Sequence, residues 1–135
     1  MPSPSKGSRQ PPAYPPSLIV HTVCQAKRTI VLRMLVDTGA TYTMIPRKAA
    51  VVVGLEPPTV SRRIPVVTAS AVEYVPLLRM PVFRCLGLEL RGLECISHDL
   101  PPESAVDGLL GLNVLRHLAP FHRFIEQIRS YLIQA

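Results

Sequence analysis

The first third of the chain alternates between short apolar runs and polar breaks, which is the pattern of β-strands joined by turns. Leu18–Val23 and Thr29–Val36 are rich in β-branched residues and are separated by Cys24–Arg28, so they predict a β-hairpin. A further short strand is expected at Thr43–Ile45. The structured part of the chain is therefore expected to begin as β-structure.

Proline and glycine then bracket a predicted short helix. Pro46 precedes Arg47–Val53, and Gly54 stands where a left-handed C-terminal cap is expected. The valines of this segment are poor helix formers, but the flanking residues favour a helix. Four more strands are expected beyond it, at Ile64–Ala69, Val72–Leu78, Met80–Leu86 and Leu88–Ile96.

The last third of the chain contains a second predicted helix. The apolar stretch Val106–Leu112 leads into Asn113, which is a good N-cap for a helix over Val114–Ala119. The final segment, Phe124–Ile133, alternates as a strand does, and we favour a strand there. Its apolar spacing also fits an amphipathic helix.

Composition divides the chain into an arm and one domain. Residues 1–16 contain six prolines and cannot bury enough apolar surface to order themselves, so we expect a disordered proline-rich arm. Residues 17–135 suit a single domain. Because apolar residues make up 47% of the chain, aromatic residues only 5% and Trp is absent, the core must be built from Val, Leu, Ile and Ala. The expected class is all-β.

Composition also bears on location and cofactors. The sequence has neither an apolar run long enough to span a membrane nor the apolar core of a secretory signal, so a cytoplasmic location away from membranes is expected. Cys24, Cys85 and Cys95 are odd in number and far apart, which indicates buried free thiols in a reducing compartment. They share no metal-like spacing with the four histidines, so we expect no metal and no other cofactor.

The net charge of +6 argues for solubility rather than for a nucleic-acid partner. The basic residues are dispersed along the chain and are not interleaved with aromatic residues, as they are on nucleic-acid-binding surfaces. We therefore expect no nucleic-acid partner.

The chemically most informative segment is Asp37-Thr38-Gly39-Ala40, directly after the apolar run that ends at Val36. Desolvation disfavours an ionised carboxylate at the end of a buried strand, so Asp37 needs hydrogen-bond donors or a shared proton. Thr38 offers a hydroxyl, and Gly39 lets the chain turn with its N–H free. An Asx-turn after a strand is the structural alternative for such a motif.

Together with the segment Val106–Leu115, this motif resembles the retropepsin-like aspartic proteases. That family carries Asp-Thr-Gly-Ala after an apolar strand and, later, apolar residues with a glycine and a short helix beneath the active-site loop. Asp107-Gly108 is interpreted as a turn without a catalytic role. Gly111 and Asn113 match the glycine and the short helix that support the active-site loop in that family. The resemblance implies a single-lobe, closed β-barrel with one or two short helices that acts as a homodimer on polypeptide substrates.

The family mechanism requires two such carboxylates, and this chain contains one Asp-Thr-Gly. The resemblance therefore implies that Asp37 from each of two subunits meets its counterpart at the two-fold axis. Two such groups share a proton, and the ionised partner activates a water for peptide hydrolysis. By resemblance, Thr38 is expected to hydrogen-bond across the dimer. The expected function is that of an aspartic endopeptidase.

The match is weakest at the flap, the hairpin that covers the substrate in that family. Its candidate here, around Val67-Thr68-Ala69-Ser70-Ala71, contains no glycine. Many viral members also pair an acid after Asp-Thr-Gly-Ala with a later arginine, where this chain has Thr41 and Leu112. The chain thus looks closer to cellular and bacterial members. A weakly active or inactive domain that binds peptides or dimerises is the alternative.

Overall fold

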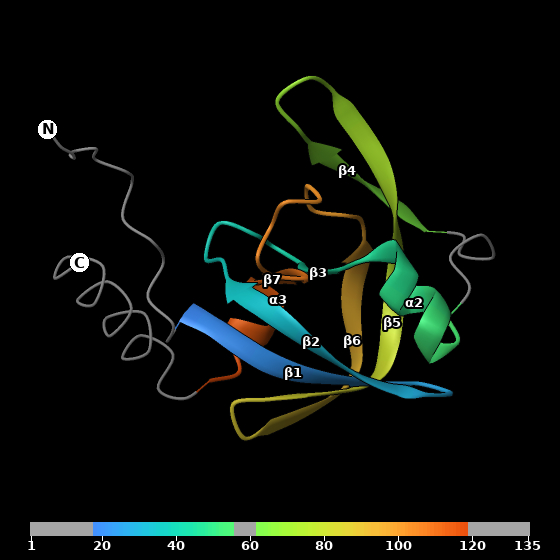
Figure 1. The fold of residues 1–135 in the computed structure, drawn as a ribbon, viewed down its shortest axis with the longest axis vertical. Coiled ribbons are helices and arrows are strands. Elements are labelled where there is room, and N and C mark those ends of the chain that lie inside the picture. Colours follow the sequence, from blue (N-terminus) through green and yellow to red (C-terminus); the bar gives the residue numbers. More distant parts are fainter. Residues whose placement is uncertain (1–17, 56–61, 119–135) are drawn as a thin grey trace, which may run out of the picture.

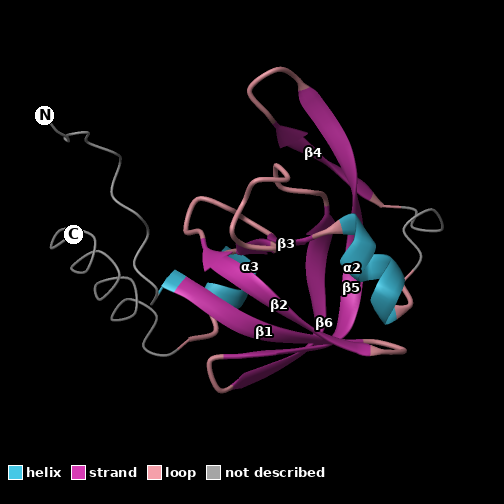
Figure 2. Cartoon of the chain, in the orientation of Figure 1, coloured by secondary structure: helices cyan, strands magenta, loops and turns pink. Residues whose placement is uncertain are grey.

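The computed structural model describes residues 18–55 and 62–118 (Figure 1). The predicted arm at residues 1–16 and the predicted strand at Phe124–Ile133 lie outside these residues. The described part consists mainly of strands with two short helices (Figure 2). In chain order the elements are β1 (Ile19–Gln25), β2 (Thr29–Val36), β3 (Thr43–Ile45), α2 (Arg47–Val53), β4 (Arg63–Val67), β5 (Val72–Cys85), β6 (Leu88–Ser97), β7 (Gly108–Leu110) and α3 (Leu112–Leu115).

The predicted hairpin and the first helix are confirmed. β1 and β2 pair in antiparallel register from Ile19 opposite Leu35 to Gln25 opposite Thr29. Helix α2 ends at Gly54, whose φ of 95° is a left-handed conformation that suits glycine. Its buried alanines and Val53 attach the helix to the barrel core.

Six strands close into a barrel. The hydrogen-bonded order is β1-β2-β7-β3-β6-β5, and β5 pairs back with β1 at Val23 opposite Arg84. Closure removes the exposed edges that an open sheet would present. β4 lies outside the ring because it pairs only with the first residues of β5. Together they form a hairpin that projects from the barrel (Figure 1).

Two of the strand boundaries predicted from the sequence are wrong. Val72–Leu78 and Met80–Leu86 are parts of one 14-residue strand, β5. The strand runs through Arg79, whose side chain is exposed between the buried Leu78 and Met80 and therefore follows the alternation of the strand. β4 covers Arg63–Val67 instead of Ile64–Ala69, because the chain turns after Val67.

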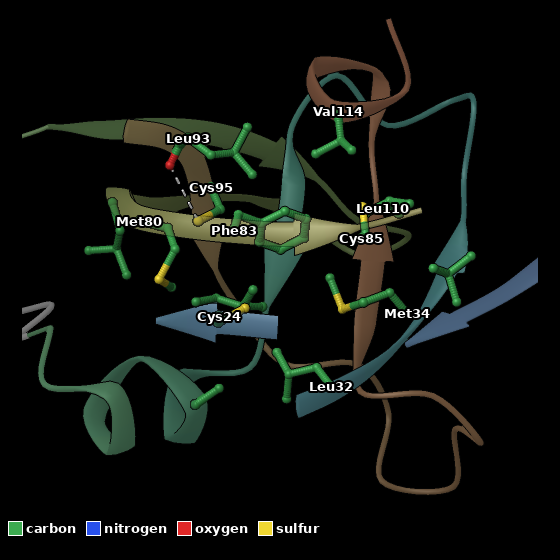
Figure 3. Close-up of a cluster of buried hydrophobic side chains, with 14 of the residues drawn as sticks. Cys24, Leu32, Met34, Met80, Phe83, Cys85, Leu93, Cys95, Leu110 and Val114 are labelled. Atoms are coloured by element: carbon green, nitrogen blue, oxygen red, sulfur yellow. Dashed lines mark hydrogen bonds between the residues drawn. The ribbon is translucent and has the colours of Figure 1, made fainter. Parts of the chain in front are cut away.

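The barrel interior is filled by aliphatic, methionine and cysteine side chains around one aromatic ring. Phe83 is fully buried, and Cys24, Cys85 and Cys95 surround it in the core (Figure 3). All three cysteines are free and buried, as expected from the sequence. Burial raises the pKa of Cys24 to about 12 and that of Cys85 to about 11, and it raises the pKa of Cys95 further. These thiols therefore stay protonated and serve as small apolar groups.

Candidate active site

The Asp37-Thr38-Gly39-Ala40 segment forms a tight loop directly after β2. The Asp37 N–H donates to the Leu110 carbonyl at 3.0 Å, so the loop begins against β7. Oδ1 of Asp37 accepts a hydrogen bond from the Gly39 N–H at 2.9 Å, and the Asp37 carbonyl accepts one from the Ala40 N–H at 3.2 Å. The Asx-turn considered from the sequence is therefore present, and it fixes a carboxylate that is partly exposed.

The end of the loop is held by the start of α3. The N–H groups of Leu112 and Asn113 donate to the carbonyls of Ala40 and Thr41, at 2.8 and 3.2 Å. These are N–H groups of the first turn of a helix, which have no partner inside the helix. The loop is thus attached to β7 at one end and to α3 at the other.

Two features near this site differ from the sequence prediction: the short strand β7 was not predicted, and helix α3 begins before the predicted start at Val114. β7 (Gly108–Leu110) pairs in parallel with the end of β2 and antiparallel with β3 at Met44. Helix α3 begins at Leu112 with Gly111 in the cap position, so Asn113 is not the N-cap. A three-residue strand is too short for its own pattern to predict it.

Asn113 instead forms a buried hydrogen-bond network beneath the loop. Its Oδ1 accepts hydrogen bonds from the N–H and the hydroxyl of Thr43, both at 2.9 Å. Its Nδ2 donates to the Glu94 carbonyl. The Thr43 hydroxyl in turn accepts a hydrogen bond from the Gly111 N–H at 3.1 Å. The sequence did not single out Thr43 as a residue that supports the site, and its signal was a hydroxyl in an otherwise apolar buried strand.

Two glycines allow the backbones in this region to approach each other closely. A Cβ on Gly108 would lie 2.1 Å from the Met44 carbonyl oxygen, and one on Gly111 would lie 2.6 Å from the backbone of Tyr42. Both distances are below any real contact, so only glycine fits at either position. The position of the Asp37 loop therefore depends on these close approaches.

Asp107 fastens the segment before β7 to the adjacent strand. Its carboxylate accepts a hydrogen bond from the Arg33 N–H at 2.8 Å, and its own N–H donates to the Arg33 carbonyl at 2.7 Å. The side chain of Arg33 also donates to the Ala105 carbonyl at 3.0 Å. Asp107 thus acts as a structural clamp, in agreement with the role expected from the sequence.

The loop forms one wall of a cleft of about 730 Å³. The opposite wall comes from β4, whose residues Ile64–Val67 face the Asp37 loop across this space. We call the hairpin of residues 63–76 the flap. The remaining lining is mostly apolar and includes Met44, Ile96 and Leu109. The described lining residues carry one formal charge, on Asp37.

The flap turns at Thr68-Ala69-Ser70-Ala71, next to the exposed side chain of Val67. The Thr68 N–H and hydroxyl both donate to the Ala71 carbonyl, each at 2.8 Å. The same hydroxyl accepts a hydrogen bond from the Ala71 N–H at 3.0 Å. A threonine side chain therefore holds this turn together without glycine.

Comparison with known proteins agrees with this geometry. The family model described as "gag-polyprotein putative aspartyl protease" matches residues 26–117, which include the Asp37 loop, the flap and α3. The chain belongs to this family. No curated protein sequence matches this family member.

A solved structure supports the fold of this aspartyl protease family member. The chain is similar to the crystal structure of a retropepsin-like aspartic protease from Rickettsia conorii, with a TM-score of 0.54 and 16% sequence identity. The similarity covers 73% of this chain and 69% of that protein. The retropepsin-like single-lobe barrel expected from the sequence is thereby confirmed.

Neither a metal site nor a membrane span is found in the described part of the structure. Residues 18–55 and 62–118 contain no group of three or more His, Cys, Asp or Glu side chains that could hold a metal ion. Among the same residues, no helix is long and apolar enough to cross a membrane.

Proposed function

We propose that this protein is an aspartic endopeptidase in which the Asp37 carboxylates of two subunits together activate a water molecule. The observation that carries the proposal is the setting of Asp37, which is held by its own loop beneath a flap, in a cleft whose other described lining residues are uncharged. A carboxylate without a neighbouring cation in its cleft suits a pair that must share a proton.

The chemistry requires a second copy of the chain. Within about 3 Å of each other, two carboxylates cannot both ionise, so the pair carries one proton. The ionised Asp37 takes a proton from water as the water attacks the scissile carbonyl, and the protonated one donates a hydrogen bond to that carbonyl oxygen. The amine then leaves with a proton supplied by the pair. No covalent intermediate forms.

The exposed side of the loop is suited to the dimer contact. Thr38 and Thr41 are exposed in the single chain, so their hydroxyls are accessible to a second loop. In the proposed dimer Thr38 donates a hydrogen bond across the two-fold axis and keeps the two Asp37 side chains in register. Gly39 and Ala40 allow the two backbones to come close.

The cleft suits an extended peptide. β4 is the last strand in the hydrogen-bonded order, so one of its edges is unpaired by the described strands. A peptide that adds beside such an edge gains backbone hydrogen bonds, and the alternate side chains enter pockets on the two walls. The lining by Ile64, Val66 and Leu109 favours apolar side chains next to the scissile bond.

The test is a peptide-library digestion from pH 3 to 7 with the wild-type chain and the Asp37→Asn variant, combined with sedimentation of both. We expect a dimer in both cases and cleavage by the wild type alone. Cleavage at the wild-type rate by Asp37→Asn would refute the proposal. A wild-type dimer that binds peptides without cutting them at any pH would select the alternative, a peptide-binding or dimerisation domain.

A further inference from the structure

A second cavity, of about 490 Å³, lies next to the cleft. Thr41 and Tyr42 line both spaces, so the two cavities share one wall. The new cavity lies between this loop segment, the end of α3 and the strands β5 and β6. The second cavity is therefore adjacent to the end of the cleft that is lined by Thr41 and Tyr42.

The two cavities differ in charge. Among the described residues, Asp37 is the one charged residue in the lining of the cleft, whereas the lining of the second cavity includes Arg79, Arg91, Arg116 and His117. We call this second space the arginine pocket. It contains one acidic residue, Glu94, so its formal charge is positive even with His117 neutral.

Glu94 offsets only part of this positive charge, because its carboxylate is shared between Arg79 of the pocket and Arg62, which does not line it. Arg62 lies 2.9 Å from Oε2 of Glu94, and Arg79 lies 3.7 Å from the same oxygen. Arg91 is paired with Glu89 at 2.8 Å. Within the described residues, Arg116 has no ion-pair partner, and its side chain is exposed. Guanidinium groups gathered in this way favour a carboxylate, which they can bind through two parallel hydrogen bonds.

Gly92 and Arg79, which both line the arginine pocket, are in contact with each other. Gly92 has a φ of 66°, and its carbonyl accepts a hydrogen bond from the Arg79 side chain at 3.4 Å. A Cβ on Gly92 would lie 3.3 Å from the Arg79 guanidinium. The glycine therefore gives Arg79 room to lie along β6 at the mouth of the pocket.

We infer that the arginine pocket is a distal substrate subsite that binds an acidic side chain of the peptide, several residues from the scissile bond. The inference rests on the proposed function and narrows its substrate class. The preferred peptide combines apolar residues, which the cleft accommodates, with a glutamate or aspartate beyond them. Because the proposed dimer is symmetric, each subunit supplies one such pocket, and the two lie at equivalent distances on either side of the scissile bond.

The experiment uses the full chain and a set of fluorogenic peptides with one apolar core sequence. A single Glu is moved from two to six residues away from the cleaved bond on either side, and each peptide has matched Gln and Lys versions. At pH 5.5, above the usual Glu pKa of about 4.3, the Glu side chain is ionised. We expect a KM about fivefold lower for Glu than for Gln at one distance from the cleaved bond, on either side of it because the two subunits supply equivalent pockets. This is the size expected of a well-placed exposed ion pair, and the Lys peptides should have a higher KM.

Substitutions of the pocket arginines then test whether the arginine pocket causes the preference for Glu. Arg91→Gln and Arg116→Gln should each reduce the Glu preference, and the double variant should abolish it, with little change in kcat for the Gln peptide. Lys48→Gln removes one exposed positive charge on α2, away from the pocket, and should leave the preference intact. Circular dichroism and sedimentation confirm that each variant is folded and assembled as the wild type is.

The outcomes separate this inference from the proposed function. Equal KM values for Glu, Gln and Lys peptides at every position would overturn the subsite and leave the endopeptidase intact. If the wild type cuts no peptide, the endopeptidase proposal fails. The binding of labelled peptides, measured by fluorescence anisotropy, then tests whether the arginine pocket binds an acidic side chain. Tighter binding of a Glu peptide that is lost in the double variant would support the pocket, and equal binding of all peptides would refute it.

Discussion

The side chain of Asn113 connects α3 to Thr43 through two hydrogen bonds of 2.9 Å, one from the backbone N–H and one from the hydroxyl. Because Nδ2 of Asn113 also donates to the Glu94 carbonyl, this one amide joins β3, β6 and α3. Helix α3 holds the end of the Asp37 loop through the N–H groups of Leu112 and Asn113. The position of the candidate catalytic carboxylate thus depends on a side chain that is distant from it in the sequence.

Replacing Asn113 with alanine should destabilise the protein by about 2–4 kcal/mol, because it removes three hydrogen bonds and leaves buried donors and acceptors unpaired. Urea denaturation followed by circular dichroism measures the change. Arg116→Gln, an exposed change at the end of the same helix, should stay within about 0.5 kcal/mol of the wild type. An equally small effect of Asn113→Ala would contradict the role assigned to the network.

Gly108→Ala should prevent normal folding, since the new methyl group would lie 2.1 Å from the Met44 carbonyl oxygen and would separate β7 from β3. Gly87→Ala is the matched control, because Gly87 has a φ of 79° but no atom within 4 Å of the place that a Cβ would take. Gly87→Ala should destabilise the protein only through the strain of a positive φ, by about 1 kcal/mol. Soluble yield and the thermal midpoint compare the two, and equal midpoints would argue against a close contact at Gly108.

The three thiols should resist alkylation in the native protein. Burial raises the pKa of Cys24 to about 12 and that of Cys85 to about 11, above the ordinary value of 9.0, so the reactive thiolate is scarce at pH 8. Iodoacetamide with mass spectrometry should find little modification under native conditions and three modified cysteines in urea. Rapid native labelling would show that the core opens readily.

The same shifts predict how the cysteines contribute to stability as pH rises. The folded pKa values lie above the unfolded ones, so this contribution is complete below about pH 9 and is lost as the pH rises towards 11–12. The free energy of unfolding of the wild type should therefore fall more steeply above pH 9 than that of a Cys24→Ala variant. Parallel slopes for the two proteins would contradict the prediction.

Thr68→Ala should loosen the tip of the flap, because the Thr68 hydroxyl both donates to and accepts from Ala71. Loss of these bonds should speed amide exchange at Ala71 and the residue after it by about fivefold, as expected for about 1 kcal/mol of local stability. Ser70→Ala, at an exposed position in the same turn, should leave the exchange rates unchanged. Hydrogen exchange followed by NMR measures both, and the result does not depend on any enzymatic activity.

Local signals made part of this fold predictable. The β1–β2 hairpin follows from alternating apolar residues on both sides of a polar turn, and α2 follows from Pro46 and Gly54. The Asp37 loop could also be predicted from the sequence, because a carboxylate and a glycine directly follow a buried strand. In each case the residues that determine the structure are neighbours in the sequence.

Long-range packing explains what the sequence did not reveal. β7 is three residues long and exists because β2 and β3 lie on either side of it, so its own residues carry no clear strand signal. Asn113 has the character of a helix cap, but the buried Thr43 hydroxyl offers it a different set of partners. The arginine pocket brings Arg79, Arg91 and Arg116 together from separate elements, and a dispersed charge pattern does not show this.

Strand β5 gives the flap and the barrel a common mechanical element. Its first residues form one side of the flap, and its last residues close the barrel against β1, without a loop between the two parts. Two consecutive buried residues, Leu77 and Leu78, mark the point where the strand passes from the small cluster beneath the flap to the main core. Any displacement of the flap must therefore bend β5 itself, because no loop separates the flap from the barrel. The strain of such bending would pass along the strand into the barrel, so we expect packing changes deep in the core to alter the rates at which the proposed peptide substrate enters and leaves the cleft.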